Sequence, residues 1–357
     1  MSEENKAPKQ FSYGGQAVIE GVMMRGAHTA AVAVRNPKGQ IEIHAQALNA
    51  ALYRGKISKT PFLRGLVLLY DALGLGTRAL MWSADKAMGE EDVSFNGPLG
   101  WGTVAVSLLL GIGLFFLLPT AAASGLESLF GLNTPAAQVE ELPDSDSTSS
   151  GSVEVAPVES PSGGVDLRPF IVNVLEGFVR LGLVVGYIWV IGRIPDVKRL
   201  FGYHGAEHKT INAYEAGAEL IPETVAQYPI EHPRCGTAFL LNVVFVSVLV
   251  FSVLGRPPFL ILLLSRIILI PVIAGIAYEI IRFTAKNMHN PIVRAIIVPN
   301  LALQHLTTNQ PDLAMIEVAI VAFKRVLVSE KLIGEEEAII PAPRPESVSP
   351  TLAGVNS

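Results

Sequence analysis

The sequence predicts a mainly α-helical, polytopic membrane protein with about four transmembrane helices and a small N-terminal cytoplasmic α+β unit. Three observations lead to this prediction. Hydrophobic residues make up 50% of the 357 residues and charged residues only 17%, whereas soluble domains carry about 25% charged residues. The apolar residues gather in four long runs. Lys and Arg are concentrated in the segments on one side of those runs.

Residues 1–100 are expected to form the cytoplasmic α+β unit. Residues 30–35 and 40–48 flank the turn Asn-Pro-Lys-Gly at 36–39, which is typical of a β-hairpin. Residues 61–88 begin with proline and repeat apolar side chains at helical spacing. Charged residues every seven positions predict one polar face of this helix: Arg64, Asp71, Arg78 and Asp85. The helix is expected either to lie on a membrane surface or to pack on the hairpin as a soluble helix.

The apolar runs cover 101–123, 169–192, 237–254 and 259–281. A helix of about 20 apolar residues crosses a hydrocarbon layer of ~30 Å, so each run predicts a span. The second run contains Glu176 and Arg180, which lie four apart on one helical face and are expected to pair. The fourth contains Arg266 and Glu279. The turn at 255–258 is short, so 237–281 is predicted to be a transmembrane hairpin.

The distribution of Lys and Arg sets the orientation. Residues 1–100 contain 11 of them, 193–236 contain five and 282–357 contain seven. Residues 124–167, between the first two runs, contain none, but they carry eight acids: Glu127, Glu140, Glu141, Asp144, Asp146, Glu154, Glu159 and Asp166. Basic segments stay in the cytoplasm, so both termini are predicted to be cytoplasmic.

The remaining segments complete the predicted organisation. Residues 124–168 form an acidic outer loop without apolar periodicity, which is expected to be disordered. Residues 282–333 are expected to form cytoplasmic, membrane-associated helices, including an amphipathic one at 312–331. Residues 334–357 form a disordered tail.

Composition also excludes several classes of protein. Cys235 is the single cysteine, so an internal disulfide is impossible. No basic tract or base-stacking pattern indicates nucleic acid, so the lipid bilayer is the expected partner. The N-terminus has no apolar core typical of a signal peptide.

The strongest chemical signal is the motif His204-Gly-Ala-Glu207-His208 in the predicted cytoplasmic segment 193–236. Residues four apart face the same way on a helix, so the two imidazoles can share one divalent transition metal, with zinc expected. Glu207 is then placed to act as a general base towards a water that the metal activates. This is the H-x-x-E-H arrangement of inverted zinc peptidases. The alternative is a polar helix whose histidines bind headgroups or cap carbonyls.

A third ligand is required. Glu215 lies on the same face but seven residues past His208, about 10.5 Å along the axis at 1.5 Å per residue, so we expect it to support the site or contact a substrate. His232 and Cys235 are better candidates, because they follow in the same loop and both suit zinc. Cys235 can equally be a small buried residue at a helix start.

Five stretches of sequence resemble the bacterial YqhQ family: 14–26, 61–65, 193–217, 232–241 and 303–312. That family has unknown function, and a metal-dependent enzymatic activity is suspected for it. The resemblance covers about 13–331 and implies a multi-pass protein of the bacterial inner membrane, with a metal site at His204, Glu207, His208, His232 and Cys235. Within 14–26 the chemically capable residues are Glu20 and Arg25, and Glu20 can be a distant ligand if this unit folds over the motif.

The leading functional hypothesis is a metal-dependent hydrolase acting at the cytoplasmic face of the membrane. The alternative is a non-catalytic membrane scaffold or assembly factor that the metal stabilises. Three protein ligands favour catalysis and four favour a structural site.

Overall fold

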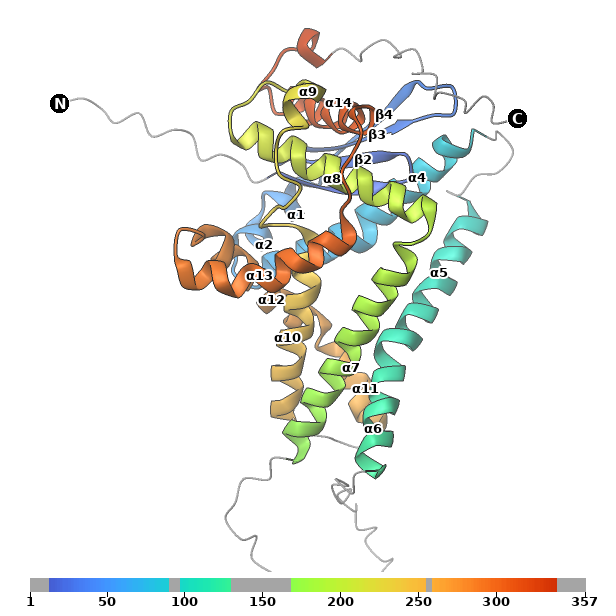
Figure 1. Cartoon of the computed structure of the whole chain (residues 1–357), viewed down its shortest axis with the longest axis vertical. Coiled ribbons are helices and arrows are strands. Elements are labelled where there is room, and N and C mark those ends of the chain that lie inside the picture. Colours follow the sequence, from blue (N-terminus) through green and yellow to red (C-terminus); the bar gives the residue numbers. More distant parts are fainter. Residues whose placement is uncertain (1–12, 90–96, 130–167, 255–258, 339–357) are drawn as a thin grey trace, which may run out of the picture.

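The computed structural model describes residues 13–89, 97–129, 168–254 and 259–338. The fold has two layers along its long axis, a mixed α/β head and a bundle of helices below it (Figure 1). The prediction of a mainly helical chain with an N-terminal α+β unit is confirmed. The predicted turn 255–258, most of the acidic loop and most of the tail lie outside the described residues.

The head contains a four-stranded antiparallel sheet in the order β1-β2-β3-β4. The predicted hairpin is present as β3 (Thr29–Arg35) and β4 (Ile41–Ala47). Two further strands, β1 (Gly14–Val18) and β2 (Gly21–Arg25), were not predicted. Four of the five β2 residues are buried, so the strand lacks the alternation of apolar and polar residues that marks a half-exposed strand.

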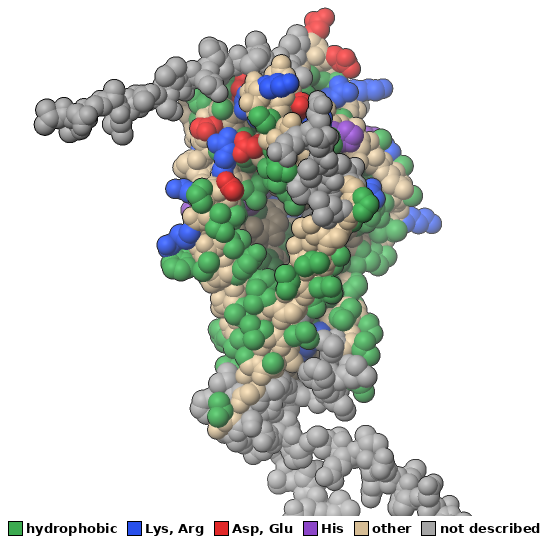
Figure 2. All heavy atoms as spheres, turned by 90° about the vertical axis from the view of Figure 1, so that its right-hand side faces the viewer, with side chains coloured by type: hydrophobic (Ala, Val, Ile, Leu, Met, Phe, Trp, Pro, Cys, Tyr) green, Lys and Arg blue, Asp and Glu red, His purple; other side chains and the backbone are tan. Residues whose placement is uncertain are grey.

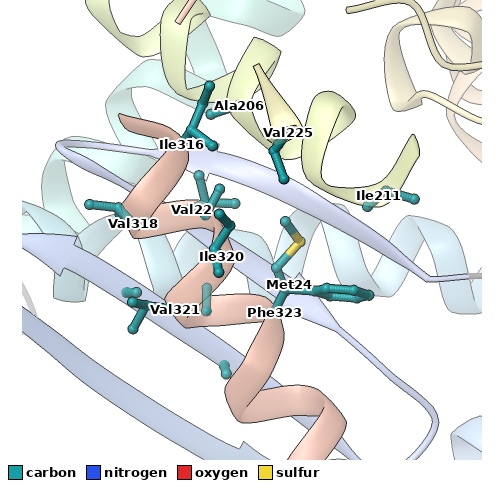
Figure 3. Packing of buried hydrophobic residues seen from close by; sticks show 14 of the residues in the cluster. Val22, Met24, Ala206, Ile211, Val225, Ile316, Val318, Ile320, Val321 and Phe323 are labelled. Carbon is teal, nitrogen blue, oxygen red and sulfur yellow. The ribbon is translucent and has the colours of Figure 1, made fainter. Parts of the chain in front are cut away.

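Helices cover both faces of the sheet. On one face lie α8 (Pro195–Glu215), the short helix α9 (Pro222–Val225) and α14 (Leu313–Ser329). Figure 3 shows Val22 and Met24 of the sheet packed against Ile320 and Phe323 of α14. On the other face lies α4 (Gly76–Met88), where Ala79 packs in a second core together with Leu75, the residue just before the helix.

The predicted continuous helix at 61–88 is interrupted. It forms α3 (Leu63–Tyr70), a π-helical turn η1 (Asp71–Leu75) and α4. Of the four charged residues predicted to share one polar face, Asp71 is buried against Arg25 at 3.0 Å and Arg64 pairs with Glu279. Two short helices precede it, α1 (Ala50–Tyr53) and α2 (Lys56–Lys59).

The bundle contains the apolar runs. The first is helical over α5 (Pro98–Ile112), a π-helical turn η2 (Gly113–Leu117) and α6 (Leu118–Leu129). The second is α7 (Arg168–Ile191) and the third is α10 (Gly236–Leu254). The helix α6 takes in residues 124–129, which the sequence assigned to the outer loop.

The fourth run is not one helix. It divides at Leu269 into α11 (Phe259–Ile268) and α12 (Ile270–Lys286), with Pro271 in the first turn of α12. A proline is tolerated at a helix start but interrupts a helix interior. A further helix, α13 (Pro291–Thr307), follows at the junction of head and bundle (Figure 1), and a short 3-10 turn (Glu336–Ala338) ends the described chain.

A buried ionic network joins the bundle helices. The predicted pair is present, with Arg180 Nη2 donating to Glu176 at 2.8 Å. Arg266 Nη2 donates to the other carboxylate oxygen at 3.1 Å, and Arg180 Nε donates to the Phe115 carbonyl in η2 at 3.2 Å. Charges buried in this way require such partners.

Two described helices are long and apolar enough to cross a membrane, Gly100–Ala122 and Phe170–Ile191, and Phe239–Leu254 is a shorter apolar helix. Only 12% of the apolar stretch of the first helix and 22% of that of the second are buried, whereas the core helix of a soluble protein is mostly buried. Figure 2 shows the resulting apolar band around the bundle, below a head that carries most of the visible charge.

Candidate metal centre

The helix α8 holds both histidines of the motif on one face. It begins at Pro195, ends at Glu215 and is followed by Gly217 with a φ of +74°, which is the left-handed stop that glycine permits. The four-residue spacing places the rings of His204 and His208 with centroids 4.4 Å apart.

Both imidazoles are oriented by backbone carbonyls. His204 Nδ1 lies 2.9 Å from the Thr307 carbonyl, and His208 Nδ1 contacts the Ile230 carbonyl. A carbonyl only accepts, so each Nδ1 carries the proton and each Nε2 lone pair is left for another partner. His208 Nε2 is buried and has no hydrogen-bond partner among the described residues. Metal-binding histidines are usually held in this way.

Cys235 completes the cluster from the residue just before α10. Its sulfur lies 3.3 Å from His204 Nε2, and one ligand atom from each of His204, His208 and Cys235 lies within 4.8 Å of the others. Thr237 contributes its hydroxyl at 3.1 Å and its backbone N–H at 3.4 Å from the sulfur. Donors at the start of a helix suit a negatively charged ligand.

The loop that carries these groups is held to α8 by two side chains. Lys209 Nζ donates to the carbonyls of Ala226 and Tyr228, and Asn212 Nδ2 donates to those of Pro229 and Glu231. These contacts hold the loop around Ile230, whose carbonyl orients the His208 ring. Burial lowers the pKa of Lys209.

The helix α13 supplies a wall of the site that the sequence did not predict. Gln304 forms a two-way clamp on His232, accepting from its N–H at 3.0 Å and donating to its carbonyl at 2.9 Å. Thr307 lies one turn further on the same helix. Both belong to 303–312, one of the stretches shared with the resembling family, which was the available signal. His305, between them, is exposed and lies 3.5 Å from Glu231.

His232 is buried beside the cluster but outside it. Its ring centroid lies 5.6 Å from that of His208, and its Nε2 lies 3.3 Å from Arg234 Nη2. Burial, and then the charges of His208 and Arg234, lower the pKa of His232 well below its ordinary value. Glu215 pairs with Arg234, whose Nη2 lies beside His232.

Glu207 points from α8 into the sheet. Its carboxylate is buried and accepts a hydrogen bond from the Gly15 backbone N–H in β1. Burial raises the pKa of Glu207 to about 7, against the opposing effects of His204 and of this hydrogen bond. A Cβ at Gly15 would lie 3.1 Å from the Glu207 side chain and 2.4 Å from the Met23 carbonyl, so this close approach requires glycine.

Glu20 and Arg25 are not brought to the cluster. Glu20 pairs with Arg199 near the start of α8 and accepts from the Tyr203 hydroxyl at 3.2 Å. Arg25 pairs with Asp71. The N-terminal unit does fold over the motif, but its contact with Glu207 comes from Gly15. Glu20 is therefore not a ligand in this arrangement.

The donor set of two imidazole nitrogens and one sulfur fits a zinc-type ion. The orphaned Nε2 of buried His208 is the observation that supports this fit, because a buried polar atom without a partner is costly. Three protein ligands of this kind would leave one position of a tetrahedral zinc ion open.

The comparisons with known proteins agree with the resemblance of the motifs. The family described as "Protein of unknown function (DUF1385)" matches residues 60–329. The "Uncharacterized protein YqhQ" of Bacillus subtilis (strain 168) is 31% identical over 351 residues, covering 93% of this chain and 96% of that protein. No solved structure matches the chain. The chain therefore belongs to the DUF1385 family, the family of YqhQ, whose function is unknown.

Proposed function

We propose that this chain is a metal-dependent hydrolase at the cytoplasmic face of the bacterial inner membrane, with zinc held by His204, His208 and Cys235. The observation that carries the proposal is that His204, His208 and Cys235 each offer a ligand atom within 4.8 Å of the others, while both Nδ1 atoms are engaged by carbonyls. A bound zinc ion would polarise a substrate oxygen and lower the pKa of a water molecule.

Glu207 is the proposed acid–base group. It adjoins His208 on α8, and the charge of His204 acts on its carboxylate. Gly15 holds the carboxylate by a backbone hydrogen bond, which fixes where a proton can be accepted. A group of this kind contributes to hydrolysis when it lies within reach of the attacking water.

The membrane topology is part of the proposal. Four crossings, by α5–α6, α7, α10 and the broken pair α11–α12, place both termini in the cytoplasm. The Lys and Arg counts support this orientation. A membrane boundary at the head end of the bundle is supported by exposed aromatic residues there: Trp101, Tyr187 and Trp189. Trp189 also lies 4.0 Å from the Arg193 guanidinium. Such residues anchor helices at a membrane interface.

The metal content of the purified full chain tests the site. The wild type, His305→Ala and Glu207→Gln should retain about one zinc ion per chain, whereas His204→Ala and His208→Ala should lose it. His305 is the matched control, because it is an exposed histidine on α13. Loss of zinc from Glu207→Gln would make Glu207 a ligand and defeat the hydrolase analogy. Unchanged zinc in both histidine variants would refute the metal site.

The second candidate is the non-catalytic scaffold stabilised by the metal. The burial of His232 next to His208 favours it. A small movement of Arg234 away from His232 Nε2 would make His232 available as a fourth ligand. Zinc content in His232→Ala separates the two functions. Retained zinc supports three ligands and an open position, and lost zinc supports a closed, structural site.

A further inference from the structure

A surface between head and bundle combines exposed apolar side chains with exposed charge of one sign. We call residues 54–73 and 280–298 the basic shelf; they take in α2, α3, the last turns of α12 and the first half of α13. Six of its basic residues are exposed: Arg54, Lys56, Lys59, Arg282, Lys286 and Arg294. Its single acid, Asp71, is buried.

The apolar side chains of the shelf are as exposed as those of the bundle. On α13, Ile292 and Ile296 lie one turn apart and are 68% and 60% exposed, while the opposite face of the helix is buried through Val293 and Ile297. Phe283 on α12 and Phe62 before α3 are 62% and 56% exposed. Large apolar side chains exposed on neighbouring elements in this way suggest an interaction surface.

The fold fixes this surface at the head end of the bundle. The helix α13 lies across the long axis at the junction of head and bundle (Figure 1), where it contacts α12, and α12 contacts α3. Gly65 of α3 crosses α12 closely at Gly275, and Arg64 pairs with Glu279 of α12.

We propose that the basic shelf lies in the headgroup layer of the cytoplasmic leaflet and binds anionic phospholipid. Its apolar side chains enter the acyl region, and Arg282, Lys286 and Arg294 contact lipid phosphates. Exposed cations without exposed acids, continuous with the apolar band of the bundle, are complementary to an anionic leaflet. This inference rests on the proposed membrane topology.

Environment-sensitive fluorophores on single introduced cysteines test the depth of the shelf. The full chain is placed in vesicles of phosphatidylcholine and phosphatidylglycerol, with labels at Ile296, at Leu109 in α5 and at Lys38 in the head. The wild type, whose Cys235 is buried, gives the background. Labels at Ile296 and Leu109 should be quenched by nitroxide lipids and protected from iodide, and the label at Lys38 should behave oppositely.

The labels distinguish failure of the shelf proposal from failure of the membrane topology. A label at Ile296 that iodide quenches, with Leu109 still in lipid, overturns the shelf and leaves the topology standing; that surface would then face water or a protein partner. If the Leu109 label also faces water, the membrane topology itself is wrong.

The charge of the shelf is tested by lipid binding in detergent. Phosphatidylglycerol should raise the unfolding temperature of the wild type more than phosphatidylcholine does, since a ligand that binds the folded state stabilises it. The variant Arg282→Gln/Lys286→Gln/Arg294→Gln should bind phosphatidylglycerol on the order of 100-fold more weakly. The control Lys38→Gln/Lys324→Gln/Lys331→Gln changes three head residues and should bind normally. An equal loss in both triple variants would refute a specific role for the shelf.

Discussion

Gly15 in the first strand donates its backbone N–H to the carboxylate of Glu207 in α8. This contact joins the N-terminal sheet to the proposed metal-binding motif. It gives a structural reason for a glycine at the start of the stretch 14–26, because a Cβ at Gly15 would press on both Glu207 and the Met23 carbonyl.

The first prediction follows from this contact. Gly15→Ala should lower the free energy of unfolding by about 1–3 kcal/mol, the usual cost of overpacking, because the Cβ would lie 2.4 Å from backbone. Gly14→Ala is the matched control, since nothing lies within 4 Å of its Cβ. Thermal unfolding of the two variants in the same detergent measures the difference. Equal stabilities would mean that β1 does not pack on Glu207 as described.

The second prediction concerns the clamp on the loop that carries Cys235. Gln304→Ala should leave the buried N–H and carbonyl of His232 without their partners, which loosens the turn that positions the sulfur. Loss of such supporting contacts typically lowers metal affinity 10–100-fold. Competition with a chelator measures zinc affinity. Gln310→Ala, an exposed glutamine in the same segment, should retain the wild-type value.

The sequence predicted the part of the site that lies close together in the chain. The spacing of His204 and His208 fixes their relative orientation once a helix forms, and Cys235 follows in the next loop. The carbonyl of Thr307 and the N–H of Gly15 could not be assigned, because backbone groups leave no signature in residue type. Their positions depend on the packing of α13 and the sheet around α8.

The secondary structure likewise divides into elements that local sequence predicts and elements that depend on packing. The hairpin β3–β4 follows from its turn residues, and the long apolar helices follow from their composition. The break in the last run had a signal in Pro271 that length alone conceals. Strand β2 had no such signal, since both of its faces are covered and its residues do not alternate.

The third prediction concerns the ionic network in the bundle. Glu176→Ala removes the carboxylate that both Arg180 and Arg266 contact. Removing one partner of a buried pair costs about 3–5 kcal/mol, so the variant should unfold at a clearly lower temperature or fail to accumulate in the membrane. Phe178→Ala on the same helix is the control, because Phe178 is 68% exposed. If Phe178→Ala lowered the unfolding temperature more than Glu176→Ala, the ionic network would not stabilise the bundle as described.

The last prediction tests where the helix after Pro61 belongs, which sequence periodicity left open between a membrane surface and the hairpin. The structure divides the region, with α4 packed on the sheet and α3 crossing α12 at Gly65 and Gly275. A Cβ at Gly65 would lie 2.8 Å from the Gly275 Cα and 2.9 Å from the Ala274 carbonyl, and backbone cannot move aside easily. Gly65→Ala should therefore destabilise the chain by about 1–3 kcal/mol.

Gly102→Ala is the control for this change, because it places the same methyl group on a bundle helix where nothing lies within 4 Å. Arg64→Ala should act in the same direction as Gly65→Ala, since it breaks the ion pair with Glu279 that joins the same two helices. Thermal unfolding of the three variants measures this ranking. If α3 were instead a soluble helix resting only on the sheet, Gly65→Ala would match Gly102→Ala, and Arg64→Ala would have no effect beyond that of an exposed arginine.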